Sequence, residues 1–347
     1  MEILKGTVLL LLVLAFFTLF SYKAPKGMKA MGALANAAVA AFLVEAFQLY
    51  VGGDLLGIEF LGEVGTAAGG MGGVAAAALV ALALGVSPVY ALLLGVSCAG
   101  MGLLPGFIAG YLVAFLVKII EKKMPAGLDL IVTILVAAPL VRLIAKYMSP
   151  VVDATLLNIG GIIAETANSN PILMGIILGG VITVVATAPL SSMALTAMLG
   201  LTGLPMAIGA LAVFGSSFMN YVLFDRLKFG NRRTTISVAI EPLTQANIIS
   251  ANPIPIYVTN FIGGAAAGIV VALAGLINNA PGTATPIAGL AVMYGFNDPL
   301  KVTITALICA TVGALSGFLG SIIFKNFKIR TLAELTKEES QPVREVA

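Results

Sequence analysis

The first candidate for chemistry is a single glutamate in a long apolar part of the chain. Glu241 is followed by Pro242 and lies in the segment 237–247, between two apolar stretches. A carboxylate at membrane depth is costly unless it is paired or faces a water-filled cavity, so such a residue is a functional candidate by default. Gln245 and Asn247 follow within a few positions and add donors and acceptors. The cluster suits a hydroxylated solute.

An alternative interpretation places Glu241 at a membrane surface, where it would pair with an arginine of the basic loop 226–233. Arg233 precedes it by eight residues, which is about 12 Å along a helix. Both interpretations stand at this point. The functional one is favoured, because polar side chains cluster around the carboxylate.

Other groups that could do chemistry are scarce. The chain contains no histidine, and its two cysteines, Cys98 and Cys309, lie inside apolar runs. Buried cysteines of this kind pack as small apolar residues and indicate neither a disulfide framework nor a metal site. We therefore expect no catalytic residue, no metal and no cofactor.

The composition is that of an integral membrane protein. Hydrophobic residues make up 59% of the 347 positions, charged residues only 10%, and the mean hydropathy is +1.06. Soluble domains carry about a quarter charged residues, so this chain could not cover a globule with polar surface. The net charge of +3 is small, and the absence of a basic face argues against a nucleic-acid partner. The lipid bilayer is the expected surrounding.

The elements that must position Glu241 are apolar helices. We expect an all-α polytopic membrane protein with about 9–11 hydrophobic segments. The segments are 6–20, 28–49, 65–84, 89–116, 128–147, 171–199, 205–224, 237–250, 253–276, 283–296 and 300–324. Two of them, 237–250 and 283–296, are too short to span and are interrupted by proline or polar residues, which predicts re-entrant hairpins. Short interrupted segments are the best sequence indication of a transport site.

The basic groups at 23–29, 118–123, 226–233 and 325–330 predict which loops face the cytoplasm, and the acidic stretch 54–63 should lie outside. An odd number of crossings is then needed between Glu63 and Lys118, where two are evident. The glycine-rich stretch 65–73 could hide an additional crossing or a re-entrant turn. We expect 1–330 to form a single membrane-embedded domain and 331–347 to be a polar cytoplasmic tail.

A short internal echo appears twice. Asn170-Pro171 opens a run that ends in Gly179-Gly180, and Asn252-Pro253 opens one that ends in Gly263-Gly264. Two interpretations remain open: a duplicated half, or ordinary helices that begin with a capping residue and proline.

Three blocks of sequence occur in a recognisable order at 177–194, 241–253 and 285–300. Their polar or turn-forming members are Pro189, Ser191, Ser192, Glu241, Asn252 and Thr285. Over 106–325 the order and spacing of these blocks resemble enzyme IIC, the membrane component of bacterial phosphotransferase-system (PTS) sugar permeases. The layout is closest to that of the fructose type.

The blocks also depart from that family. Val185 replaces its aspartate, Ser191 and Ser192 replace its asparagine and lysine, and Ile287 replaces its histidine. Only the glutamate clearly remains. The chain is therefore similar to a divergent second type of enzyme IIC, some members of which are described as membrane-bound toxin regulators.

The resemblance implies a homodimer in a bacterial cell membrane. Its transport domain would carry Glu241 and two re-entrant hairpins and would move past a fixed scaffold to give alternating access. Glu241 would accept hydrogen bonds from sugar hydroxyls, with Gln245, Asn247 and Asn252 as supporting donors. Pro189, Ser191 and Ser192 would form a cavity wall, beside Pro242 and Thr285.

Phosphorylation is the step that the residues support least. In the family, a cytoplasmic IIB protein phosphorylates the sugar. Without histidine or an exposed cysteine this chain cannot carry a phosphoryl group, so any transfer must come from such a partner. Two alternatives remain: a permease of the same fold that moves its solute unphosphorylated, and a membrane sensor that binds a solute without net transport.

Overall fold

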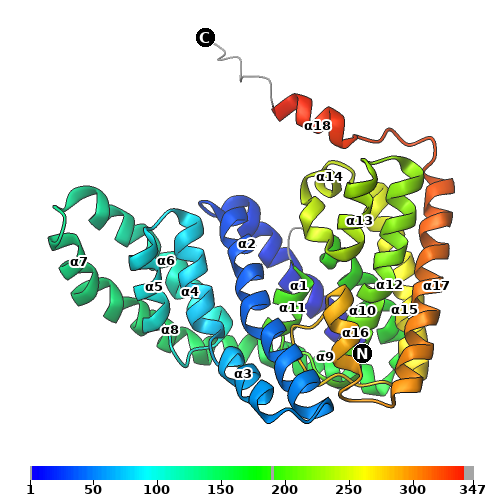
Figure 1. The fold of residues 1–347 in the computed structure, drawn as a ribbon, viewed down its shortest axis with the longest axis horizontal. Helices are drawn as coiled ribbons and strands as arrows, with labels where there is room; N and C mark the ends of the chain where they lie inside the picture. The colour runs from blue at the N-terminus through cyan, green and yellow to red at the C-terminus, as the bar shows by residue number, and fades with distance from the viewer. Residues whose placement is uncertain (1, 189–190, 340–347) are drawn as a thin grey trace.

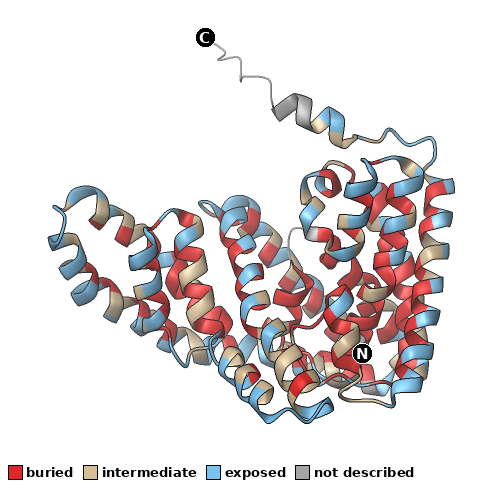
Figure 2. Cartoon of the chain, viewed as in Figure 1, coloured by how far each residue is buried: buried red, intermediate tan, exposed pale blue. Residues whose placement is uncertain are grey.

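The computed structural model describes residues 2–188 and 191–339, and in these ranges every regular element is a helix (Figure 1). Within these described ranges, seven helices are long and apolar enough to cross a membrane, or up to eight if one bent pair is counted as a span. Buried residues line the inner faces of the helices, and exposed ones cover the outer faces (Figure 2). Leu135 and Leu319 are among the large apolar side chains exposed there. The chain is an all-α, multi-pass membrane protein, as predicted.

A basic turn connects the first two helices. α1 is Glu2–Lys23, and α2 (Gly27–Ala38) continues through the π-helical segments η1 (Val39–Leu43) and η2 (Ala46–Leu55) as one rod. Between them, Lys26 donates a hydrogen bond to the carbonyl oxygen of Leu84 at 2.8 Å, and Lys118 donates to the same oxygen at 3.0 Å. The basic groups 23–29 and 118–123 therefore lie together.

Between Glu63 and Lys118 the chain forms a bent pair of helices, a short apolar helix and a long apolar helix, and only the bent pair and the long helix are long enough to span. α3 (Glu59–Gly69) and α4 (Gly72–Leu84) form the pair that is bent by 54°. The predicted segment 89–116 is not one helix but two, α5 (Pro88–Ser97) and α6 (Leu103–Lys123). The amide of Ser87 donates to Glu121 Oε1 at 3.0 Å, so α5 begins where α6 ends, and the two helices are antiparallel.

A single long helix links the two halves of the molecule. It consists of α7 (Leu128–Val132), η3 (Thr133–Ala137), α8 (Ala138–Val152), η4 (Asp153–Leu157) and α9 (Asn158–Ser169). Its apolar part covers 40 residues, which is about 60 Å and twice the thickness of a bilayer core. It cannot cross a membrane upright. It runs from the group α2–α8 to the group α9–α17 (Figure 1), so the predicted span 128–147 is only its first half.

The second group of helices contains the short segments. Its members are α10 (Pro171–Thr187), α11 (Ser192–Met198), α12 (Gly203–Leu227), α13 (Arg232–Ile240), η5 (Pro242–Gln245), α14 (Ala246–Ala251), α15 (Pro253–Ala274), α16 (Pro286–Met293) and α17 (Pro299–Ile323). α18 (Leu332–Glu339) follows outside the bundle. We call the end of this bundle at which α12 and α17 finish the basic end. It carries Arg226, Lys228, Arg232, Arg233, Lys325, Lys328 and Arg330.

Glycines bring the long helices of this bundle into close contact. A Cβ at Gly268 of α15 would overlap the carbonyl of Gly175 in α10, and one at Gly264 would overlap that of Gly179. As the residue number increases along α10, the number of the contacting residue in α15 decreases, so these two helices are antiparallel. In α12 and α17, Gly215 meets Gly313 and Met219 meets Gly317, so that pair is parallel. A two-fold duplication would give both pairs the same relation, so the difference argues against a duplicated half. Asn170 caps α10 by accepting from the amide of Leu173, whereas the Asn252 side chain makes no such bond to α15.

Candidate functional site

Glu241 lies at the tip of a hairpin that enters the bundle from the basic end. α13 stops at Ile240, Glu241 has an extended backbone (φ −148°, ψ 101°), and η5 begins at Pro242. Both ends of the hairpin are tied to residues 330–332, where α18 begins. The amide of Leu332 donates to the carbonyl of Phe229 at 2.9 Å, and Asn252 bonds the main chain of Arg330. The chain therefore enters and leaves on one side, as predicted for a re-entrant hairpin.

A second turn reaches Glu241 from the opposite end. Asn297 clamps its base, accepting a hydrogen bond from the amide of Ile277 at 2.9 Å and donating to the carbonyl of Ile277 at 2.7 Å. Inside the turn, Asn278 Nδ2 donates to Thr283 Oγ1 at 2.9 Å. The turn ends at Thr285, directly before α16, and Thr285 Oγ1 donates to Glu241 Oε2 at 3.4 Å. This bond joins two segments that are 44 residues apart in the sequence.

The break between α10 and α11 forms the third side. Ser191 has a positive φ of 60° and caps the start of α11, with its hydroxyl accepting a hydrogen bond from the amide of Ala194 at 3.3 Å. Ser192 Oγ donates to the carbonyl oxygen of Ala284 at 2.6 Å. The break is thereby attached to the turn that carries Thr285. Pro189 lies outside the described residues.

These three elements enclose one cavity. Its lining residues are Ala186, Ser191, Ser192, Met193, Val213, Glu241, Pro242, Ala284, Thr285 and Pro286. Five of the nine predicted site residues are among them. The cavity volume is about 10 Å³, which is about the smallest that admits a single water molecule. In this conformation the site is closed.

The remaining predicted residues lie elsewhere on the Glu241 hairpin. Gln245 Nε2 donates to Thr244 Oγ1 at 3.3 Å, and Asn247 is exposed, with its Oδ1 accepting from the amide of Ile248. Asn252 is only 2% exposed, and its amide group is bonded to the carbonyl of Ile248 and to the main chain of Arg330. The structure does not bring these three side chains to the cavity.

Sequence reasoning missed the residues that hold the turns in place. Asn278, Thr283 and Asn297 shape the Thr285 turn, and Val213 supplies the floor of the cavity from the middle of α12. A signal for the first three was present. Asparagine and threonine between apolar runs need partners, and here they find them in the turn itself. Nothing distinguished Val213 from its apolar neighbours.

Comparison with known families gives one match. The sequence profile of the family described as "Phosphotransferase system, EIIC" matches residues 28–336. The match covers most of the chain, including all three elements of the cavity and both groups of helices. No curated protein and no solved structure matches the chain.

Proposed function

Because the chain belongs to the phosphotransferase system EIIC family and is therefore a membrane component of sugar transport, we propose that Glu241 receives the hydroxyl groups of the transported sugar. The observation that carries the proposal is the hydrogen bond from Thr285 to Glu241 at the point where two hairpins from opposite ends meet. A carboxylate accepts charge-assisted hydrogen bonds, which are stronger than neutral ones. The Thr285 hydroxyl marks the position that a sugar hydroxyl would take.

The closed cavity supports an alternating-access mechanism. A volume of about 10 Å³ excludes a sugar, so binding requires the surrounding turns to separate. If the basic end faces the cytoplasm, as the lysine and arginine distribution favours, withdrawal of the Glu241 hairpin opens the site inward. Withdrawal of the Thr285 turn opens it outward. Each hairpin then serves as the gate on its own side.

We propose that the two groups of helices move relative to each other during this cycle. The group α9–α17 holds all three elements of the cavity, and the long helix of 128–169 links it to the group α2–α8 (Figure 1). The group α9–α17 would carry the solute, and the group α2–α8 would form the scaffold of a homodimer in a bacterial cell membrane.

Phosphorylation, in this proposal, is the work of a separate IIB protein at the cytoplasmic side. The chain has no histidine, and Cys98 and Cys309 are both buried. Neither cysteine is accessible to a phosphate donor. A hydroxyl of the bound sugar would receive the phosphoryl group directly from the IIB protein once the Glu241 hairpin withdraws.

Binding by the purified protein tests the site. Candidate sugars are titrated against the wild type, Glu241→Gln and Glu165→Gln, in which Glu165 is an exposed glutamate of α9. We expect Glu241→Gln to weaken binding by about tenfold or more, the cost of a hydrogen bond to a charged group, and Glu165→Gln to leave it unchanged. Equal affinity of the wild type and Glu241→Gln would refute the assignment.

Uptake into vesicles then separates the modes of action. Accumulation of sugar phosphate only when a IIB protein and a phosphoryl donor are enclosed supports phosphotransfer. Uptake of unmodified sugar without them supports a non-phosphorylating permease, and binding without uptake in either condition supports a sensor.

A further inference from the structure

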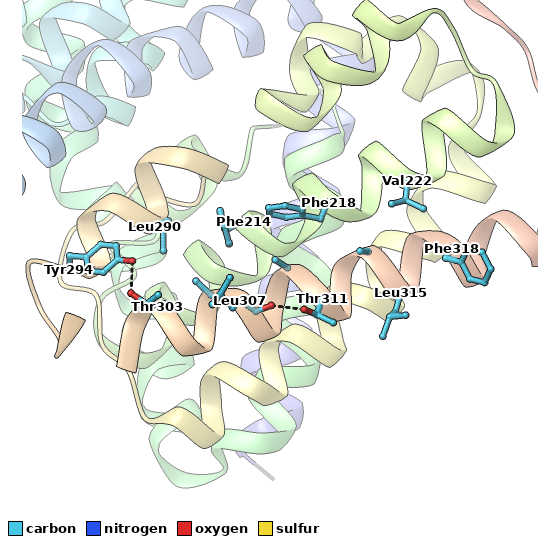
Figure 3. A pocket seen from close by; sticks show the side chains of 13 residues that line it. Phe214, Phe218, Val222, Leu290, Tyr294, Thr303, Leu307, Thr311, Leu315 and Phe318 are labelled. Atoms are coloured by element: carbon cyan, nitrogen blue, oxygen red, sulfur yellow. Dashed lines mark hydrogen bonds between the residues drawn. The ribbon is translucent and has the colours of Figure 1, made fainter. Parts of the chain in front are cut away.

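An apolar groove lies between α12, α16 and α17. Its volume is about 700 Å³, and its walls include Phe214, Phe218, Leu307, Leu315 and Phe318 (Figure 3). It lies apart from the Glu241 cavity, with which it shares no lining residue. Its far end, away from the basic end, is marked by the hydrogen bond between Tyr294 and Thr303.

A second apolar depression lies on the other side of the same two phenylalanines. Its volume is about 400 Å³, and it is lined by Phe214 and Phe218 together with Ile240 and Ile287 of the neighbouring hairpins. The two rings touch edge to face, with centroids 5.4 Å apart. Phe214 and Phe218 thus form a ridge shared by two apolar depressions, which we call channels.

The positively charged side chain of Arg226 lies where the groove meets the basic end. The guanidinium of Arg226 lies over the ring of Phe318, a groove wall, at 4.5 Å from the ring centroid. Arg226 Nε donates to Ser321 Oγ at 2.7 Å, and this bond fixes the orientation of the guanidinium group. Among the described residues its terminal nitrogens have no hydrogen-bond partner. The nearby Lys228 is paired with Asp225 at 3.7 Å, whereas Arg226 lies against a wall of the groove and can offer its terminal nitrogens to a ligand there.

The distance along α12 from Arg226 to Phe214 is close to the thickness of one leaflet of a bilayer. Arg226 and Phe214 are 12 positions apart on α12, or about 18 Å, and half of a bilayer core is about 15 Å. We propose that this face binds one anionic diacyl phospholipid, with its phosphate on Arg226 and its two acyl chains on either side of the Phe214–Phe218 ridge. A planar guanidinium recognises phosphate oxygens by paired hydrogen bonds.

The position of this lipid connects it to the transport site. Ile240 and Ile287 line the second channel and are neighbours in sequence of Glu241 and Pro286, which line the cavity. An acyl chain in that channel would press on both hairpins. The proposal goes beyond the proposed function and does not depend on the role of Glu241.

Native mass spectrometry of the full-length protein in a non-ionic detergent tests the proposal. The delipidated protein is titrated with phosphatidylglycerol or with phosphatidylcholine of the same acyl chains. We expect phosphatidylglycerol to saturate at one tightly held molecule per chain, and Arg226→Gln to weaken its retention by about tenfold. Arg232→Gln, a change at the same end but away from the groove, should retain it.

A second pair of variants tests the groove itself. Ala314→Trp places an indole inside it and should displace the lipid, whereas Leu319→Trp, at an exposed position of α17 that does not line it, should not. Equal retention of phosphatidylglycerol by the wild type, Arg226→Gln and Ala314→Trp would overturn the proposal. So would equal retention of the two lipids, or cross-linking through Leu315→Cys that shows this face covered by a second copy of the chain.

Discussion

The hydroxyl of Thr285 lies 3.4 Å from the carboxylate of Glu241 and joins the tips of two hairpins that enter the bundle from opposite ends. This contact defines the closed site. In the proposed mechanism, the same carboxylate oxygen exchanges the threonine hydroxyl for a solute hydroxyl. The strength of the Thr285 bond therefore influences both the closed state and the affinity.

The first prediction concerns this bond. Thr285→Val removes the hydroxyl and keeps the shape, and a hydrogen bond to a carboxylate contributes about 1 kcal/mol or more even at a length of 3.4 Å. We expect the hairpins to part more easily, which shows as a severalfold faster hydrogen exchange of the segment 241–251. Thr311→Val is the matched control, because the Thr311 hydroxyl bonds only the carbonyl of Leu307 in its own helix. Unchanged exchange in Thr285→Val would contradict the prediction.

The second prediction concerns the link between the α10–α11 break and the Thr285 turn. Ser192 is buried, and its hydroxyl donates to the carbonyl of Ala284 at 2.6 Å. Ser192→Ala leaves that carbonyl without this partner, at a cost of about 1–3 kcal/mol. Thermal unfolding in detergent should shift downward by several degrees. Ser316→Ala, which removes only a bond within α17, should shift it much less.

Some residues of the cavity could be predicted because the chemistry of Glu241 is visible locally in the sequence. A carboxylate inside an apolar run needs an explanation wherever the chain folds. Its contact with Thr285 could not be predicted in the same way. That contact depends on how deeply two hairpins penetrate, and the depth is determined by packing between segments that are 44 residues apart.

The helix boundaries show the same limit. The turn that separates α5 from α6 is formed by the small and apolar residues 98–102, with Gly100 at a φ of 73°. Because helix and turn are equally apolar here, hydropathy alone merges them. The opposite error occurs at 147–158, where Pro150 and Asp153 suggest an end. The long helix continues there, and Asp153 begins a π-helical segment.

The third prediction follows from the glycines between α10 and α15. A methyl group at Gly268 would overlap the backbone of Gly175, so Gly268→Ala must push the helices apart. Overpacking of this kind costs about 1–3 kcal/mol. At Gly161 of α9 a Cβ meets nothing within 4 Å, and alanine is the better helix former by up to about 1 kcal/mol. Thermal unfolding should therefore move down for Gly268→Ala and stay level or rise for Gly161→Ala.

The fourth prediction concerns the segment that follows α17. Asn252, at the end of the Glu241 hairpin, donates to the carbonyl of Arg330 at 2.8 Å and accepts from its amide at 2.8 Å. Ile329, Leu332 and Leu335 pack against the apolar cluster at the base of the hairpin. This segment therefore acts as a strap across the hairpin that would open the site on the basic side.

Asn252→Ala should loosen the strap, because it removes both bonds to the main chain of Arg330, together with the bond to the carbonyl of Ile248. We expect faster hydrogen exchange at 329–335 and, as a consequence, at 232–251, with little change in α10 or α17. Asn247→Ala is the comparison, since Asn247 is exposed on the same hairpin and bonds only the amide of Ile248. If Asn252→Ala affected the strap but left the hairpin unchanged, the two would be independent, and the strap would have no part in opening the site.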